Sequence, residues 1–407
     1  MLSTASRETI RATLPVVGAH LDAITTTFYR RMFAARPELE RDLFNRGNQH
    51  QGEQQKALAG AVAAFASLQL DPDPERVALI LSRIAHKHAS LGVTAEQYWI
   101  VHEHLFAAIV EILGEAVTPE VASAWDEVYW LMAHTLIDLE NGLYARSGVQ
   151  PGEVWRTVRV ARRELQSADA VTFTLTALPG EELPRFAPGQ YISVGAHLPD
   201  GARQIRQYSL CGSPSDETWR ITIKRVPASI GPDGSTRPAG EVSNHLYNTV
   251  FEGDELSVTT PFGDLELIDD GSPVLLASAG IGCTPMLGML HHLASSPERE
   301  REVAIVHADR SLADHAHRRE LEEVARSIPG STLHRWYETI TDEHAVPALV
   351  RAGRADIAEL PVREGTRAYL CGPLPFMMSL REGLIARGVP ASRIHYEVFG
   401  PDSWSAR

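Results

Sequence analysis

The sequence is poor in cysteine, contains no long apolar run and carries no excess of positive charge. Its three cysteines, at positions 211, 283 and 371, are too few and too scattered for a disulfide framework or for a zinc or iron–sulfur site made of thiolates. No stretch reaches the roughly 18 consecutive apolar residues that read as a membrane-spanning helix. The 38 Lys and Arg residues are outnumbered by 52 Asp and Glu residues, so a net charge of −14 gives no electrostatic reason to bind nucleic acid or anionic lipid.

These absences favour an ordinary globular protein of a reducing cytoplasm. The N-terminal segment lacks a basic stretch followed by an apolar core, so a signal peptide is not expected. Hydrophobic residues make up 44% and charged residues 22% of the 407 residues, which excludes a mostly disordered chain. At about 150 residues per domain, the length predicts two or three domains.

The pattern of apolar and polar residues changes twice along the chain. Residues 1–146 are typical of successive amphipathic helices, and Pro and Gly steps separate these helices. Short β-type runs within residues 153–265 predict a small antiparallel barrel, with a surface loop at 228–240. From residue 270 to 407, continuous apolar strands alternate with helical stretches, as in a doubly wound α/β sheet. The predicted helices are 5–36, 52–68, 74–91, 95–115 and 119–144; the predicted strands are 158–161, 171–177, 190–194, 207–210, 219–226, 255–260, 274–279, 303–308 and 367–370.

A strand, a glycine turn and a helix open the third domain. The turn reads Gly280-Ile281-Gly282-Cys283-Thr284-Pro285 and precedes a helical stretch at 286–293. Glycines at such a turn let a pyrophosphate approach the backbone, and the helix N-terminus supplies N–H donors. The third glycine of the usual dinucleotide motif is absent. On this motif alone, an ordinary loop without a bound nucleotide is therefore also an acceptable interpretation.

Two further motifs lie at predicted strands. Alternation places Arg206 and Tyr208 on one face of a barrel strand, and a guanidinium beside a planar aromatic suits a ring system linked to a phosphate. An exposed Arg beside a half-buried Tyr is the alternative. The strand that ends at Cys371-Gly372-Pro373 places its Gly-Pro break where a parallel sheet binds ligands.

Six ordered motifs resemble the ferredoxin-reductase-like flavoproteins over residues 154–401. They are PGQY (188–191), RQYS (206–209), GEVSNHL (240–246), GIGCTP (280–285), CGP (371–373) and EVFGP (397–401). The resemblance implies FAD and NAD(P)H as cofactors. Two departures are Cys283, where relatives often carry Gln, and the long 228–240 loop. By resemblance, the FAD-binding residues are Tyr191, Arg206, Gln207, Tyr208, Ser209, Val242, Ser243, Val398, Phe399, Gly400 and Pro401; the NAD(P)H-binding residues are Gly280, Ile281, Gly282, Cys283, Thr284, Pro285, Cys371, Gly372 and Pro373.

One histidine in the N-terminal third lies on an apolar stripe. The stripe consists of Val77, Leu81, Ile84 and His88 at helical spacing, so His88 is expected to face the interior. This placement fits two alternatives. His88 could be a core histidine that is hydrogen-bonded to a protein group, or it could be an axial haem ligand.

Polar groups on the other predicted helices could accompany this histidine. Gln54 stands at one end of an apolar face that includes Leu58, and Tyr29 lies at the margin of another core face. A core tyrosine is the alternative for Tyr29. A capping box at residues 94–97 fixes Tyr98 in the first turn of a helix. Glu140 lies among apolar neighbours, where it could form a charged rim or accept from the His88 ring N–H.

Residues 1–146 resemble a globin, and the whole chain resembles the flavohaemoglobins. The match lies in FYRRMF (28–33), PELERDLFN (37–45), NQHQGEQ (48–54), KH (87–88) and EQYWIVHEHL (96–105). The resemblance implies haem b with His88 as the proximal iron ligand and Phe44, Gln54 and Leu58 as haem-pocket residues. It also implies Tyr29, Tyr98 and Glu140 as catalytic residues, with Lys87 and Glu397 tuning the haem and flavin.

The resemblance implies an NAD(P)H-dependent nitric oxide dioxygenase. Electrons pass from NAD(P)H through FAD to the haem, and NO and O₂ become nitrate, which serves nitric oxide detoxification. We expect a monomer with small-molecule partners. An oxygen carrier or sensor, a plain flavin reductase and a haem-linked reductase of peroxides stay open as alternatives.

Overall fold

The computed structural model describes residues 2–50, 52–71, 73–230, 234, 236–296, 301–340, 349–360 and 362–400. They fall into two compact units. The first contains the chain up to residue 156 together with residues 195–206, and the second contains residues 157–194 and 207–399. Among the helices of these residues, none is both long and apolar enough to cross a bilayer.

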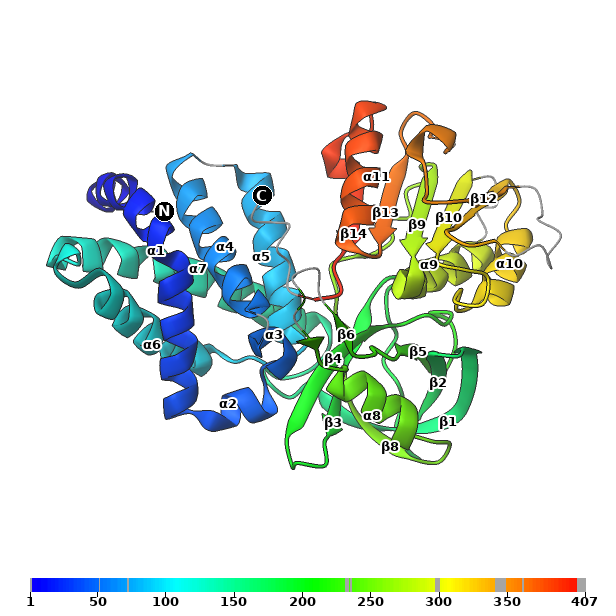
Figure 1. Cartoon of the computed structure of the whole chain (residues 1–407), viewed down its shortest axis with the longest axis horizontal. Helices are drawn as coiled ribbons and strands as arrows, with labels where there is room; N and C mark the ends of the chain where they lie inside the picture. Colours follow the sequence, from blue (N-terminus) through cyan, green and yellow to red (C-terminus); the bar gives the residue numbers. More distant parts are fainter. Residues whose placement is uncertain are drawn as a thin grey trace. The chain divides into compact units, whose positions relative to one another are not determined.

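The N-terminal part of the first unit consists of α-helices (Figure 1). Several of them begin where the sequence supplies a cap: the Asp73 side chain accepts from the Arg76 N–H, and Thr94 and Gln97 form the expected capping box. The long first helix packs against four others through side chains such as Ile10 and Met32, which have no exposed surface. The helices are α1 (Thr4–Ala35), α2 (Pro37–Asp42), α3 (Arg46–His50), α4 (Glu53–Leu70), α5 (Pro74–Ala89), α6 (Ala95–Leu113) and α7 (Pro119–Arg146).

Helices α2 and α3 are absent from the sequence-based prediction. They have six and five residues, which is too short for a helical period to show. The other five helices were predicted with ends within a few residues of those observed.

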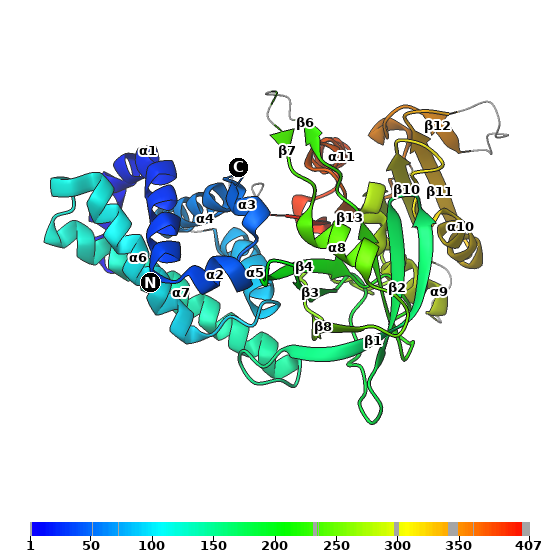
Figure 2. The same cartoon turned by 60° about the horizontal axis from the view of Figure 1, so that its bottom comes forward.

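The barrel region is a six-stranded sheet of order β4-β3-β8-β1-β2-β5 (Figure 2). Strand β1 is much longer than predicted because its second half carries charged, outward-facing residues that hide its β character. The predicted surface loop contains the short hairpin β6–β7. A helix, α8 (Glu241–Thr249), follows the hairpin. The strands are β1 (Trp155–Ser167), β2 (Ala170–Ala177), β3 (Tyr191–His197), β4 (Arg203–Ser209), β5 (Trp219–Lys224), β6 (Ser229–Ile230), β7 (Thr236–Arg237) and β8 (Glu255–Thr259).

The C-terminal region is a parallel sheet of order β12-β11-β10-β9-β13-β14. Strands β9, β10 and β13 were predicted, whereas β11, β12 and β14 were missed. The glycine turn and the Gly-Pro break both follow central strands, at the carboxyl edge of the sheet. The strands are β9 (Val274–Ala279), β10 (Val303–Asp309), β11 (Ser331–Tyr337), β12 (Val350–Ala352), β13 (Arg367–Cys371) and β14 (Ile394–Glu397); the helices are α9 (Cys283–Ser295), α10 (Arg318–Ser327) and α11 (Leu374–Ala386).

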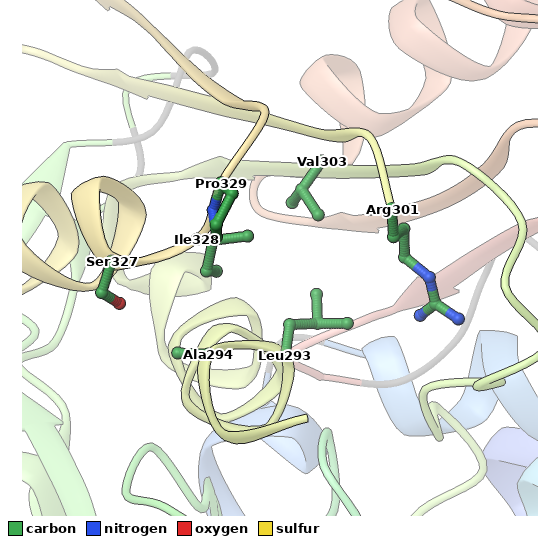
Figure 3. A pocket seen from close by; sticks show the side chains of 7 residues that line it. All are labelled: Leu293, Ala294, Arg301, Val303, Ser327, Ile328 and Pro329. Atoms are coloured by element: carbon green, nitrogen blue, oxygen red, sulfur yellow. The ribbon is translucent and has the colours of Figure 1, made fainter. Parts of the chain in front are cut away.

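A small cavity lies at the opposite, amino-terminal edge of this sheet (Figure 3). Leu293 at the end of α9, Val303 at the start of β10 and Ile328 after α10 line it together with Arg301. Its volume of about 10 Å³ has room for about one water molecule, and ligands of open α/β sheets bind at the other edge. This cavity is therefore not the nucleotide site.

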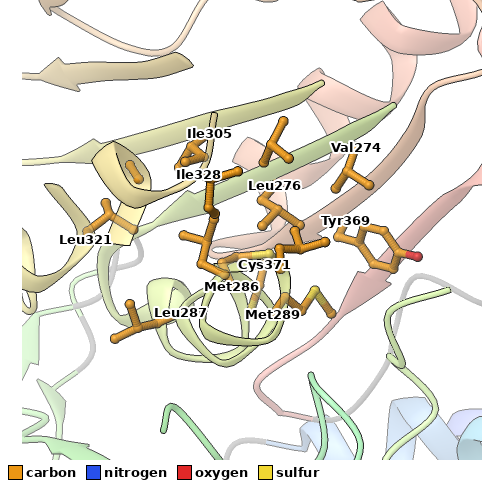
Figure 4. Packing of buried hydrophobic residues seen from close by; sticks show 14 of the residues in the cluster. Val274, Leu276, Met286, Leu287, Met289, Ile305, Leu321, Ile328, Tyr369 and Cys371 are labelled. Carbon is orange, nitrogen blue, oxygen red and sulfur yellow. The ribbon is translucent and has the colours of Figure 1, made fainter. Parts of the chain in front are cut away.

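The core of the α/β region forms between the sheet and helices α9 and α10 (Figure 4). Leu276 of β9, Ile305 of β10 and Tyr369 of β13 meet Leu287 of α9 and Leu321 of α10 there, and each has at most 2% of its surface exposed. Burying a side chain of this size stabilises the fold by about 1.5–3 kcal/mol. This packing holds the start of α9, and with it the glycine turn, in a fixed position.

Candidate functional site

Three polar side chains of the first unit form a buried hydrogen-bonded group at the C-terminal end of α5. Nδ1 of His88 lies 2.8 Å from Oε1 of Glu140 and 3.0 Å from the hydroxyl oxygen of Tyr98. The Tyr98 hydroxyl donates to the same Glu140 oxygen at 2.5 Å. Glu140 is 2% exposed, so its carboxylate accepts both bonds away from water. The arrangement gives Nδ1 of His88 a proton and fixes the plane of the ring.

Local structure explains why these groups meet. His88 lies in the last turn of α5, and the capping box starts α6 six residues later, which places Tyr98 in its first turn. Helix α7 packs against α5 and brings Glu140 to the same point. Burial and the charge of Glu140 raise the pKa of Tyr98 well above its usual range, so its hydroxyl keeps the proton that it donates.

The second ring nitrogen of His88 is open. Among the described residues Nε2 has no hydrogen-bond partner, and one third of the side chain is exposed. Within the stripe, Val77, Ile84 and His88 are half-buried. Leu81 is fully packed, on a face of α5 that also carries Ile80. An imidazole with one nitrogen held by a carboxylate and the other open suits an axial iron ligand.

A second group of polar side chains surrounds Tyr29 on α1. Tyr29 is 5% exposed, and the side chains of Gln54 of α4 and Gln49 of α3 lie beside its hydroxyl. Burial raises the pKa of Tyr29 above its usual range, so its hydroxyl is protonated at physiological pH. Phe44 packs edge-on against Tyr29, with 5.8 Å between the ring centroids. Sequence reasoning missed Gln49, although it lies in a motif that carried the globin resemblance.

An apolar cavity of about 40 Å³ lies between α1, α4, α6 and α7. Leu58 and Val62 of α4 line one side, and Ile24 of α1 and Leu105 of α6 contribute to the others. Leu58 was predicted as a haem-pocket residue. Apolar cavities of this kind hold small apolar molecules rather than ordered water.

Most of the residues assigned to FAD by resemblance lie on β3, on β4 and in the first turn of α8. Gln207 donates through Nε2 to the Ser193 hydroxyl at 3.0 Å, so its side chain is used within the sheet. Ser209 is buried at the end of β4. In α8, Ser243 accepts from the Val226 N–H, and Val242 is buried. The backbone N–H groups of this first helical turn are oriented to bind an anion such as a pyrophosphate.

The two nicotinamide motifs lie side by side at the carboxyl edge of the parallel sheet. Gly282 approaches the Cys371 carbonyl so closely that a Cβ at position 282 would collide with it. The glycine is therefore required for the close packing of both loops. Cys283 is buried, with its thiol directed at the Ala316 carbonyl 3.8 Å away, so only its backbone can face a nucleotide.

The remaining predicted residues lie at the end of β14 and on α5. Glu397 ends β14, Val398 is half-buried and Phe399 is half exposed. Pro401 lies outside the described residues. Lys87 precedes His88 on α5 and is half-buried.

Comparison with known proteins resolves the family. Residues 26–136 match the globin family model, and residues 276–382 match the oxidoreductase NAD-binding domain model. A flavohemoprotein of Chromobacterium violaceum is 43% identical over 98% of both chains, and one of Bordetella pertussis is 42% identical over 98% of this chain. The chain belongs to the flavohemoprotein family.

Solved structures of flavohemoproteins show the same fold. The crystal structure of flavohemoglobin from Malassezia yamatoensis, with bound FAD and haem, is 37% identical, has a TM-score of 0.86 and covers 98% of this chain and all of that one. The FAD/NAD-binding domain of a nitric oxide dioxygenase from Vibrio cholerae is 35% identical, with a TM-score of 0.53, and covers 61% of this chain and all of that one. The predicted architecture, a globin followed by an antiparallel barrel and a parallel α/β region, is confirmed.

Proposed function

We propose that the chain is an NAD(P)H-dependent nitric oxide dioxygenase that converts NO and O₂ to nitrate. Its haem would bind at His88, FAD along β4 and at the first turn of α8, and NAD(P)H at the loops 280–285 and 371–373. When bound, the nicotinamide supplies a hydride, the flavin divides the electron pair and the haem iron binds O₂. The proposal extends to a monomer in the cytoplasm, where the buried, free cysteines stay reduced.

The single observation that carries the proposal is that the globin helices hold two buried polar groups, one at His88 and one at Tyr29. In the first, Glu140 accepts from Nδ1–H of His88 and would make the imidazole a stronger donor to iron. In the second, the Tyr29 hydroxyl keeps its proton and could donate to a bound diatomic ligand. A simple oxygen carrier needs neither the strong proximal carboxylate nor a reductase in the same chain.

The test uses the purified full-length chain. We expect one haem and one FAD per chain from the absorption spectrum and extraction. With NADH or NADPH and O₂, we expect continuous NO consumption and one nitrate formed per NO. Cofactor-loaded protein that consumes NADH but forms no nitrate from NO would contradict the proposal.

A reductase of apolar peroxides is the second candidate. The observation that favours it is the apolar cavity beside Leu58, which could accept an alkyl chain. The same preparation separates the two functions, because alkyl hydroperoxide would then oxidise NADH faster than NO does. A slower peroxide reaction excludes this candidate as the main activity.

A further inference from the structure

Gln204 of β4 is a fully buried polar side chain with an unusual set of partners. Its Nε2 donates to the carbonyl oxygens of Arg41 at 3.0 Å, Phe44 at 3.1 Å and Glu40 at 3.3 Å. Its Oε1 accepts from the Arg46 N–H at 3.2 Å. All these residues belong to the first compact unit. One amide therefore binds the backbone of residues 40–46 at four points.

These partners are the groups that a short helix leaves without partners. Helix α2 ends at Asp42, so the carbonyls of Glu40 and Arg41 lack partners within the helix. Arg46 begins α3, and the first N–H groups of a helix have no acceptor within it. Gln204 thus completes the end of one helix and the start of the next. Losing several of these partly buried hydrogen bonds together would cost more than losing one average hydrogen bond.

Residues 40–46, here called the α2–α3 link, carry Phe44. The Phe44 ring packs edge-on against Tyr29 and against Phe33, with a centroid distance of 5.4 Å to the latter. The position of Phe44 in the globin pocket therefore depends on the link, and the position of the link depends on Gln204.

Further contacts join the same two segments. Asp42 accepts from the Arg203 N–H at 3.2 Å, and Arg46 forms an ion pair with Asp200 at 2.7 Å. Nη1 of Arg206 lies 3.4 Å from Oε1 of Gln204. Helix α3 and strand β4 accordingly lie side by side in both overall views (Figures 1 and 2).

We propose that Gln204 is a positioning residue for electron transfer: it fixes the α2–α3 link, with Phe44, to the strand whose Arg206 holds FAD. The inference rests on the proposed function. In that function, bound NAD(P)H would supply two electrons to the flavin, which would pass them one at a time to the haem iron. No bond of Gln204 changes in this step. Its amide sets how firmly the α2–α3 link, which carries Phe44, is held to β4, as preorganisation requires.

The main test replaces Gln204 by methionine, which has a similar size but no amide. Gln190→Met is the matched control, because the Gln190 side chain likewise accepts from a backbone N–H, that of Ala187, and donates to an oxygen, that of Glu266. In stopped flow with NADH under CO, we expect unchanged flavin reduction and haem reduction slowed by about tenfold in Gln204→Met. The control should match the native protein in both phases.

Hydrogen exchange supplies a readout independent of activity. In the holoprotein, amides of the α2–α3 link should exchange about tenfold faster in Gln204→Met, whereas those of α6 stay protected. The Gln190→Met variant should leave both regions unchanged.

A charge-swap pair covers the case in which Gln204→Met loses a cofactor. Arg46→Asp faces Asp200 with a like charge at a partly exposed position and should slow haem reduction, and adding Asp200→Arg should restore it. If Gln204→Met retains one haem and one FAD per chain, its rate of haem reduction tests the positioning role. If it loses a cofactor, the rates of Arg46→Asp and of the Arg46→Asp/Asp200→Arg double variant test it instead.

The outcomes are distinct. Faster exchange in the link with an unchanged rate of haem reduction, or no rescue by the swap, overturns the positioning role and leaves the proposed function standing. A native protein in which reduced flavin never reduces the haem overturns the proposed function itself.

Discussion

At the scale of single residues, burial decides what the Tyr29 hydroxyl can do. Because burial raises its pKa, Tyr29 is a donor and not an anion, and Gln54 and Gln49 lie beside it. Tyr29→Phe should retain haem and FAD but release O₂ faster and consume NO more slowly. Removing one preorganised donor costs about 10²–10³ in rate at an oxyanion site, and less is expected for a partial charge.

Flash photolysis of the O₂ complex and an NO electrode measure these two effects. Tyr144→Phe is the control, because the Tyr144 hydroxyl donates to the Val93 carbonyl at 2.6 Å. An O₂ dissociation rate that is equal in Tyr29→Phe and the native protein would show that the hydroxyl points elsewhere.

Glu140 acts on the iron only through His88. In Glu140→Gln the amide oxygen can still accept from Nδ1–H, but the negative charge is gone, so the imidazole becomes a weaker donor. We expect a lower iron–histidine stretching frequency in the resonance Raman spectrum of the ferrous, ligand-free protein. Glu127→Gln on the same helix should leave the frequency unchanged, because Glu127 binds Ser3 and Ser6. Equal frequencies in all three proteins would mean that Glu140 does not polarise His88.

At the scale of elements, the start of α10 joins the parallel sheet to the barrel. His317 precedes this helix and lies 2.7 Å through Nε2 from the Thr222 hydroxyl of β5, and its Nδ1 lies 2.9 Å from Glu320. Burial alone would lower the pKa of His317, but its interactions with Cys211 and Glu320 outweigh burial and raise it to about 9. Arg220 of β5 also pairs with Glu320.

This raised pKa predicts a stability that depends on pH. A histidine whose pKa is higher in the folded state stabilises it fully below its unfolded value, 6.5, and the stabilisation is lost as the pH rises through about 9. By calorimetry, His317→Gln should lower the unfolding temperature of the flavin–nicotinamide part at about pH 6, and the difference should shrink towards about pH 10. The exposed His197→Gln is the control substitution. A difference independent of pH would mean that His317 is neutral in the fold.

Elements were predictable where local pattern and burial agree. The capping box at Thr94 and the continuous apolar run of β9 each reveal an element without tertiary information. Strand β11 was missed because His334 and Arg335 interrupt its apolar run, although both are buried; Arg335 pairs with Glu322 of α10. A buried charge such as that of Arg335 is stable in a strand only because a residue of another element pairs with it. A local sequence pattern does not show such a partner.

The residues of the candidate site likewise divide into those that the sequence could predict and those that it could not. Helical spacing and resemblance led to His88, Glu140 and Tyr29, because each lies on a long periodic helix. Gln49 and Gln204 were not found, since one lies on a five-residue helix and the other acts on a segment about 160 positions away.

At the scale of the whole molecule, the chain combines a haem-binding part with a flavin–nicotinamide part that exists alone in the Vibrio cholerae structure. Cutting between residues 147 and 152 should leave a folded globin that, once chemically reduced and oxygenated, destroys one equivalent of NO and then stops. The remainder should still reduce artificial acceptors with NADH. Sustained NO consumption should need the intact chain.

The physical reason is effective concentration. A short linker holds the two parts at an effective concentration of about millimolar. A mixture of the two fragments at micromolar concentration should therefore turn over more slowly, by about the ratio of these two concentrations. The contacts of residues 195–206 with the α2–α3 link should give the mixture weak, saturable association, visible as a rate that rises with fragment concentration. An NO electrode and a concentration series measure both. Mixed fragments that match the full-length rate at micromolar concentration would show that the fusion does not sustain turnover, and a lone globin that turned over with NADH would contradict the whole electron path.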